Sequence, residues 1–438
     1  MSPSVGTRKK ITGEISLPKE LALKLQKEVQ NLKDLAEKLP SWETADTSHL
    51  VMTLLGSAVF LAVSDLHLEA EEQGAKLRAR IDGMLHDVAE LSQTTYEALL
   101  SRIKLLSGIK LNVSDRPQDG RFTFLFKETL PVEIRVSSLP SEHGESLVLR
   151  LLNPKSLKTV KDLGLREDLL LLFQKEIKKP NGMILVTGPT GSGKTTTLYA
   201  FLKEVQSPKI KIITIEDPIE YRLGGISQTQ VSSGKQYTFA LGLRAIVRQD
   251  PDVILVGEIR DEETAAIAVQ AALTGHLVFS TLHTNDAAGT IARLLSLRAN
   301  AANVSAALNL IIAQRLVRKV CGACSKTRKA SAKELDAVKK GLKNLPKEIR
   351  PKIPAAFEVS EPKGCRECNN TGYKGRVGIF EAIVADDALE TFVTKSPSIA
   401  ELRMYAEKAG MVTMYQDGLL KVLEKTTTLQ EVERVTAE

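Results

Sequence analysis

The residues whose types and spacing point most directly to chemistry form one glycine-rich stretch near the middle of the chain. Its glycines allow backbone N–H groups to turn toward a polyphosphate, and a helix that starts at its end adds partial positive charge. In the pattern G-x-x-x-x-G-K-[ST], the lysine reaches the β- and γ-phosphates and the next hydroxyl holds Mg²⁺. We therefore predict binding of a nucleoside triphosphate by Gly188, Pro189, Thr190, Gly191, Ser192, Gly193, Lys194, Thr195 and Thr196, with Thr195 as the Mg²⁺ ligand.

Two carboxylates follow apolar runs that predict strands of the same sheet. Glu216 comes after the run that ends at Ile215, and Glu258 follows Val253–Val256 and one glycine, a Walker B arrangement. Carboxylates at the carboxyl ends of parallel strands face the ligand crevice. We predict that Glu258 supports Mg²⁺ and that Glu216 orients the attacking water, and the reverse assignment remains open.

Two of the six histidines bracket the next predicted strand, in His276-Leu-Val-Phe-Ser-Thr-Leu-His283. A single histidine is usually a core or surface residue. Two of them around one strand beside the phosphate loop favour a role for His283 as a sensor of the γ-phosphate.

All four cysteines fall into two C-x-x-C pairs, separated by forty residues. Four thiolates suit tetrahedral Zn²⁺, and a closed shell of four cysteines is typical of a structural site. An iron–sulfur centre and unmetallated thiols are the alternatives. We predict a zinc module over about residues 315–385, with the ligands Cys321, Cys324, Cys365 and Cys368.

These residues need a scaffold, and the pattern around them predicts a doubly wound parallel sheet. Apolar runs near 183–187, 211–215, 253–257 and 277–281 predict its strands, with helices between them. Residues 325–356 and the tail after Ala388 are expected to be mostly helical. The chemistry is therefore assigned to the C-terminal part of the chain.

The N-terminal part predicts an α+β domain. Its expected elements are a helix over 50–63, strands over 65–69 and 76–81, a turn at Asp82-Gly83, a helix over about 90–107, and strands over 121–126, 132–136 and 146–152. Before it, one amphipathic helix is expected from Pro18 to Leu39, ended by Pro40, and residues 1–16 are expected to be loosely held. That helix either packs on its own domain or docks a partner.

Composition excludes several classes of protein. The 60 basic and 53 acidic residues leave a net charge of only +7, and aromatic residues make up 4%, so a base-stacking nucleic-acid surface is not expected. No run of about 18 apolar residues predicts a membrane span. The N-terminus has no apolar segment typical of a secretory signal, so we expect a cytoplasmic protein.

Together these motifs resemble the type II secretion and type IV pilus assembly (extension) ATPases of the secretion ATPase superfamily. The resemblance runs from about Asp46 to the C-terminus. It is carried by the phosphate loop, His283 and seven further strings: Ser64-Asp-Leu-His-Leu-Glu69, Arg80-Ile-Asp-Gly-Met-Leu85, Arg116-Pro-Gln-Asp-Gly-Arg121, Arg135-Val-Ser137, Glu216-Asp-Pro-Ile-Glu220, Gly257-Glu-Ile-Arg-Asp261 and Gly372-Tyr-Lys-Gly-Arg-Val-Gly378. One departure is Glu69-Ala70 where the family has Glu-Pro.

The resemblance implies an N-terminal extension over 1–44, a PAS-like domain over 45–153, a linker over 154–161 and a RecA-like ATPase domain over 162–438, with C-terminal helices over 386–438. It implies a homo-hexamer in which Arg121 and Arg135 close on the nucleotide. It also implies work on an inner-membrane platform protein, peripheral to the membrane, with recruitment by a membrane-anchored partner. The short extension leaves that recruiting partner open.

The resemblance implies an ATP-hydrolysing motor that assembles a type IV pilus or a type II secretion pseudopilus. The alternatives are a pilus retraction motor, whose family members lack the cysteine module, a RecA-like nucleic-acid motor, and a nucleotide-gated scaffold. Low charge and few aromatic residues disfavour a nucleic-acid partner.

Overall fold

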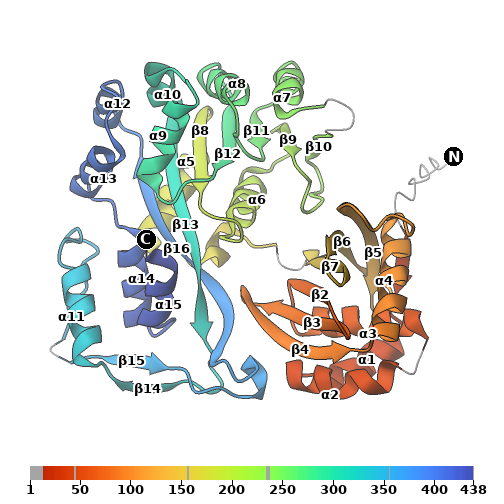
Figure 1. Cartoon of the computed structure of the whole chain (residues 1–438). Helices are drawn as coiled ribbons and strands as arrows, with labels where there is room; N and C mark the ends of the chain where they lie inside the picture. Colours follow the sequence, from red (N-terminus) through yellow and green to blue (C-terminus); the bar gives the residue numbers. More distant parts are fainter. Residues whose placement is uncertain (1–12, 44–45, 155–156, 233–236, 355, 438) are drawn as a thin grey trace. The chain divides into compact units, whose positions relative to one another are not determined.

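The computed structural model describes residues 13–43, 46–154, 157–232, 237–354 and 356–437 (Figure 1). They form two compact units, one within Met1–Ser156 and Lys363–Lys374, the other within Leu157–Pro362 and Gly375–Glu438. Residues 1–12, where we predicted loose structure and no secretory signal, lie outside the described residues, as do residue 44 of the predicted extension and residues 155–156 of the predicted linker.

The first unit is built on one mixed sheet of seven strands. Their spatial order is β1 (Glu14–Ser16), β5 (Gln118–Phe126), β6 (Leu130–Ser141), β7 (Gly144–Leu152), β2 (Asp65–Glu71), β3 (Gly74–Ile81) and β4 (Met84–Leu91). Among the described strands of this sheet, only β1 and β5 pair in parallel, and the other neighbours pair antiparallel. Helices α3 (Thr47–Phe60) and α4 (Gln93–Ser107) contribute apolar residues to the same core. The predicted mixture of helices and strands is confirmed here.

Two strands of this sheet, β1 and β4, were not predicted. The expectation of loose structure up to residue 16 is wrong for Glu14–Ser16, because this segment pairs with β5. The predicted turn is present, since Asp82 and Gly83 have φ values of 51° and 84° between β3 and β4. The predicted helix from about Glu90 begins later, at Gln93, because the Ser92 hydroxyl accepts the Thr95 N–H and caps the helix. Residues before Ser92 are thus free to extend the hairpin.

The prediction of one helix from Pro18 to Leu39 is wrong. The segment forms α1 (Lys19–Glu28) and α2 (Leu32–Glu43), because the Asn31 side chain accepts the Asp34 N–H and starts a new helix. Pro40 lies inside α2 and does not end it. The apolar stripe is buried in the core of the first unit, including Leu25, Val29, Leu35 and Leu39, which settles the open alternative in favour of packing.

The start of α2 also holds the segment Lys363–Lys374. The Leu32 N–H donates to Asn369 Oδ1 at 2.6 Å, and Arg366 pairs with Asp34 at 2.9 Å. Partial burial acts to raise the pKa of Asp34, but the Gln30 N–H and the Arg366 guanidinium outweigh it and hold the pKa below its usual value. Both contacts fix this segment against the helix terminus.

The second unit is built on a sheet in the order β10 (Ser227–Gln230), β9 (Ile212–Glu216), β11 (Val253–Val256), β12 (Leu277–Leu282), β8 (Gly182–Thr187), β13 (Leu308–Val320) and β16 (Tyr373–Val384). The first six strands pair in parallel. The four predicted strands β8, β9, β11 and β12 are confirmed. Strands β10, β13 and β16 were not predicted.

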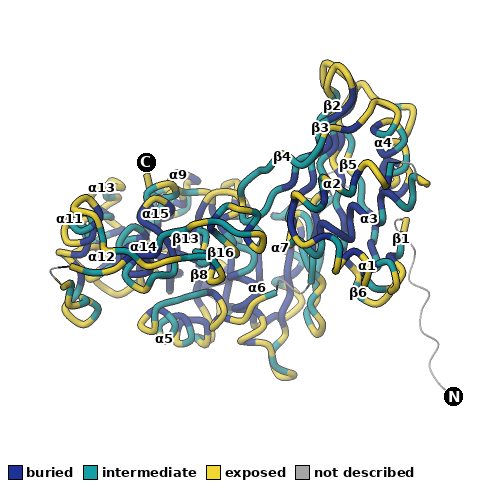
Figure 2. The backbone as a smooth tube through the Cα atoms, turned by 90° about the horizontal axis from the view of Figure 1, so that it is seen from below, coloured by how far each residue is buried: buried dark blue, intermediate teal, exposed yellow. Residues whose placement is uncertain are grey.

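Both faces of this sheet are covered, since every residue of β8, β9, β11 and β12 is buried; Figure 2 draws buried residues in dark blue. Met183 and Leu185 of β8 pack with α7 (Phe239–Val247), α8 (Glu262–Leu273), α9 (Ala287–Ser296) and α10 (Ala301–Ala307). The alternate residues Ile184 and Val186 pack with α5 (Glu167–Glu176) and α6 (Lys194–Val205). Strands covered on both faces are continuously apolar, which is why their sequences were recognisable.

The rest of the unit is largely helical, as predicted for the tail. It contains α12 (Asp387–Val393), α13 (Ile399–Lys408), α14 (Met414–Leu423) and α15 (Leu429–Thr436). Residues 325–356 are less helical than predicted: α11 (Ala332–Gly341) follows the short strand β14 (Lys326–Lys329), which pairs with β15 (Glu358–Glu361). Among the described residues, no helix is long and apolar enough to cross a bilayer.

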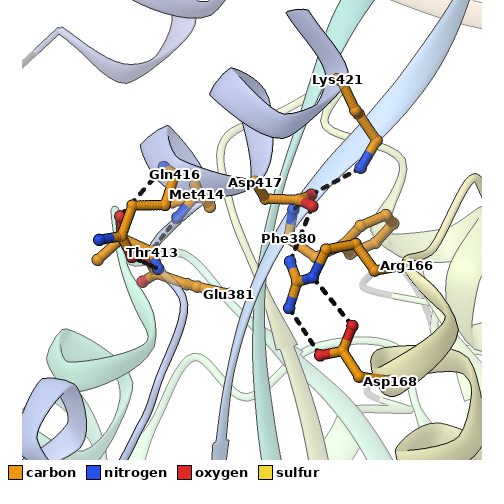
Figure 3. A network of polar contacts seen from close by, with 9 residues as sticks. All are labelled: Arg166, Asp168, Phe380, Glu381, Thr413, Met414, Gln416, Asp417 and Lys421. Carbon is orange, nitrogen blue, oxygen red and sulfur yellow. Dashed lines mark hydrogen bonds and ion pairs between the residues drawn. The ribbon is translucent and has the colours of Figure 1, made fainter. Parts of the chain in front are cut away.

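A buried network of charges joins α5, β16 and α14 (Figure 3). The fully buried Asp417 accepts from Arg166 at 2.8 Å, from Lys421 at 2.9 Å and from the Phe380 N–H at 2.8 Å. Burial acts to lower the pKa of Arg166, but Asp417 and Asp168 outweigh it and raise the pKa. This carboxylate therefore connects three separate elements of the unit.

Candidate nucleotide-binding site and metal centre

The phosphate loop has the conformation that its sequence predicts. It leaves the buried strand β8, passes through Gly188, Gly191 and Gly193 with φ values of 147°, 80° and 91°, and enters α6 at Lys194. Such positive φ values suit glycine and turn backbone N–H groups toward a common centre. The loop is thus a preformed cradle for an anion.

Gln314, on β13, supports this loop from beneath and was not predicted. Its amide donates to the Ser192 carbonyl at 2.8 Å and its oxygen accepts from the Thr197 hydroxyl at 2.6 Å. A Cβ on Gly188 would come within 2.5 Å of the Gln314 carbonyl oxygen. This contact explains why glycine is needed at the first position of the loop.

Lys194 lies where the pattern requires its charge. Its ammonium donates to the carbonyls of Gly188 at 2.7 Å and Pro189 at 3.2 Å, without a carboxylate in direct contact among the described residues. Burial lowers the pKa of Lys194, the nearby charge of Glu258 opposes this, and Arg315 adds to the lowering. The lysine is therefore held by neutral groups that a phosphate can replace.

Glu258 and His283 are brought together, as predicted for residues of one site. His283 Nε2 lies 3.3 Å from Glu258, which also pairs with Arg260 at 2.5 Å. The Glu258 side chain is 13% exposed, and its charge acts on Lys194. A carboxylate next to the phosphate-loop lysine is suitably placed to support Mg²⁺.

The other predicted carboxylate, Glu216, is enclosed by hydroxyl and amide donors. Thr214 donates at 2.6 Å and Gln228 at 3.2 Å to one oxygen, while the Tyr199 hydroxyl donates to the other. Burial raises the pKa of Glu216 despite these donors. Glu220 acts on Glu216 electrostatically from the same loop and was not singled out from the sequence, although it ends the quoted string Glu216-Asp-Pro-Ile-Glu220.

The end of β12 is tied to the end of β8, which positions His283. The hydroxyls of Thr187 and Thr284 lie 2.7 Å apart, and the Thr284 N–H donates to Thr187 at 2.9 Å. His276, which precedes β12, instead has its ring Nδ1 2.9 Å from the carbonyl oxygen of Ala271, in the last turn of α8. Of the two bracketing histidines, only His283 therefore belongs to the site.

The predicted arginines form part of a row across the sheet of the first unit. On five neighbouring strands, from β5 through β6, β7 and β2 to β3, the residues that lie opposite one another in register are Arg121, Arg135, Arg150, Asp65 and Arg80. Arg150 pairs with Asp65 at 2.8 Å, and Arg121 and Arg135 each lie 3.9 Å from the Glu133 carboxylate. Arg150 was not predicted, because only strand register reveals that it stands beside Arg135.

The four cysteines are brought together. All four sulfur atoms lie within 4.8 Å of one another, and the Cys365 and Cys368 sulfurs are 3.8 Å apart. Tetrahedral zinc with bonds of about 2.3 Å requires sulfurs about 3.8 Å apart. The N–H groups of Cys365 and Gly372 point at Cys368 Sγ at 3.1 and 3.2 Å, which stabilises a thiolate. The donor set therefore fits zinc.

Comparison with known proteins agrees with this geometry. The model of the family described as type II/IV secretion system protein matches residues 42–434. The chain is 43% identical over 416 residues to type II secretion system protein E of Pseudomonas aeruginosa, covering 93% of this chain and 80% of that protein. It is 40% identical over 408 residues to the type IV pilus assembly ATPase PilB of Myxococcus xanthus, covering 93% and 70%. The solved structure of the pilus retraction motor PilT with ADP superimposes with a TM-score of 0.60 at 28% identity, covering 88% of this chain and 96% of that one.

Proposed function

Because the chain belongs to the type II/IV secretion system protein family, we propose that it is the ATP-hydrolysing motor that assembles a type IV pilus or a type II secretion pseudopilus. The observation that carries the proposal is the phosphate loop with Lys194, next to the pair Glu258–His283. We place the motor in the cytoplasm, at the inner membrane, as a homo-hexamer acting on a membrane platform protein.

Binding follows from the loop. Backbone N–H groups between Gly188 and Thr196 surround the β- and γ-phosphates of ATP, and Lys194 exchanges its carbonyl partners for phosphate oxygens. Thr195 and Glu258 hold Mg²⁺, which neutralises charge on the phosphates when bound. His283 contacts Glu258 and senses the γ-phosphate.

Hydrolysis needs a base near the γ-phosphate. The raised pKa of Glu216 suits a group that accepts a proton from water, and its three donors fix its orientation. With a 4% exposed fraction, however, Glu216 must exchange one of these donors for the water. Glu220, on the same loop, is the competing base.

The transition state carries negative charge that arginines stabilise, an effect typically worth about 10³–10⁵ in rate. We propose that the first unit is a PAS-like domain and the second a RecA-like domain, and that Arg121 and Arg135 close on the nucleotide. Their row in the sheet supports this role, and Arg150 joins them by register.

The test is steady-state ATP hydrolysis by the assembled ring. We expect hydrolysis to be stimulated by the cytoplasmic domain of the platform protein and not by DNA or RNA. We expect Glu216→Gln to lower kcat by at least about 100-fold, with Glu220→Gln and Arg150→Ala measured beside it. A wild type no faster than Glu216→Gln and Glu220→Gln would reduce the protein to a nucleotide-gated scaffold, and stimulation by nucleic acid alone would make it a nucleic-acid motor.

Retraction is the nearest alternative, because the retraction motor PilT shares the fold. The cysteine cluster favours assembly. We expect about one zinc per chain by metal analysis. A retraction motor would be favoured if the purified protein contained no zinc and if deleting it left fibres that assemble but do not retract.

A further inference from the structure

The residues between the two cysteine pairs, 325–364, carry almost all of the net charge of the chain. They contain eleven of its 60 basic residues and five of its 53 acidic residues, a net charge of +6 out of +7. We call this segment the basic insertion. Apart from it, the chain is nearly neutral, so its electrostatic attraction for an anionic partner is concentrated here.

The basic insertion is held in a fixed position. Val338 and Leu342 of α11 are buried with Leu419 and Leu420 of α14, and Gln416 donates to the Gly341 carbonyl at 3.1 Å. Figure 1 shows α11 beside the C-terminal helices α14 and α15. One face of the helix is thus anchored, and its charges point away from that anchor.

The two arginines of the insertion are used internally. Arg328 makes a two-bond pair with Glu334 at 2.7 Å, and Arg350 donates to the Leu345 carbonyl at 2.7 Å. The free charges are lysines: Lys333, Lys339, Lys343, Lys347 and Lys352 are exposed and make no ion pair among the described residues. Lysine is a compact point charge without the planar fork that recognises one phosphate or base.

We infer that the basic insertion is a membrane-docking surface that binds bilayers rich in anionic phospholipid. Lysines without ion partners, two on the anchored helix α11 and three in the segment that follows it, suit a diffuse negative surface. A nucleic acid is disfavoured because Phe357 is the only aromatic residue of the insertion and offers no stacking platform. The inference rests on the proposed location at the inner membrane and specifies which surface reaches it.

The experiment is co-sedimentation of the full-length, zinc-loaded protein with vesicles, without nucleotide. Vesicles of phosphatidylcholine alone are compared with vesicles containing about 30 mol % phosphatidylglycerol. The variant is Lys333→Gln/Lys339→Gln/Lys343→Gln/Lys347→Gln. Its matched control replaces with glutamine four exposed lysines elsewhere in the second unit that make no ion pair within the described part of the chain: Lys161, Lys175, Lys178 and Lys203.

We expect the wild type and the control to bind only the anionic vesicles and to be released by about 0.5 M salt. Each lysine near an anionic surface contributes about fivefold in affinity, so the variant should bind more than about 100-fold more weakly. Unchanged zinc content and lipid-free ATP hydrolysis would show that the variant is folded. Because binding is measured without ATP, this result is independent of whether the motor proposal holds.

Equal binding by variant and wild type, or no preference for phosphatidylglycerol, would overturn the inference. So would lysine-dependent binding to polyglutamate or single-stranded DNA without any binding to vesicles, because the partner would then be an acidic protein or a nucleic acid.

Discussion

Gln314 offers a direct test of how the phosphate loop is held. Gln314→Met preserves the length of the side chain but removes both hydrogen bonds, to Ser192 and to Thr197. The Thr197 side chain is fully buried and Ser192 nearly so, and each buried group left unpaired costs about 1–3 kcal/mol. Two such groups are left unpaired, so we expect the free energy of unfolding of the second unit to fall by about 2–6 kcal/mol.

The assay is urea unfolding, with the affinity for a fluorescent ATP analogue measured in parallel. Thr197→Val removes the same contact from the other side, so a double-mutant cycle isolates it, with an expected coupling of about 0.5–3 kcal/mol. Gln270→Met is the control, because the Gln270 side chain is exposed and makes no hydrogen bond among the described residues, so stability should change by less than about 0.5 kcal/mol. Additive single effects, or a loss no greater than that of the control, would refute the role of Gln314.

Three further predictions concern the rest of the chain. Asp417→Asn should cost about 3–5 kcal/mol of unfolding free energy, because Arg166 and Lys421 lose a buried counter-charge; a urea midpoint close to that of the wild type would contradict this. Burial acts to raise the pKa of Glu431, but Arg318 and Arg434 hold it at about 2, below the 4.5 of an unperturbed glutamate. Its stabilisation is therefore complete above pH 4.5 and is lost as the pH falls toward 2; Glu431→Gln should be less stable by about 3 kcal/mol at neutral pH and no less stable near pH 2 in urea titrations. Zinc chelation should expose residues 315–385 to limited proteolysis first, and earlier cleavage within the nucleotide sheet would rule out a local role for the metal.

The fold could be predicted where a short run of sequence is enough to identify a helix or a strand. Strands β8, β9, β11 and β12 are short apolar runs, each covered on both faces. Strand β13 was missed because polar residues follow its apolar start, among them Gln314, whose purpose appears only when the phosphate loop lies against it. The single helix expected before Pro40 is two helices, because Asn31 caps the second one. This local capping signal was overlooked because the apolar residues appeared to continue in one helical stripe.

The residues of the candidate site also divide into those that local sequence identifies and those that depend on contacts between distant segments. The phosphate loop, Glu258 with His283, and the four cysteines follow from local spacing, and the structure places each group as expected. Arg150 and Gln314 depend on strand pairing between distant segments, which no single window of sequence contains. The enclosure of Glu216 by Tyr199 and Gln228 is likewise a product of three separate elements.

The central claim is that this chain hydrolyses ATP at the phosphate loop with the help of Glu258. The most direct measurement compares ATP binding and ATP turnover by the wild type and by Glu258→Gln in the same preparation. The account predicts ATP affinity within about tenfold of the wild type and turnover reduced by at least about 100-fold, since the substitution removes the charge beside Lys194 but leaves the loop intact. Equal turnover by the two proteins would contradict it.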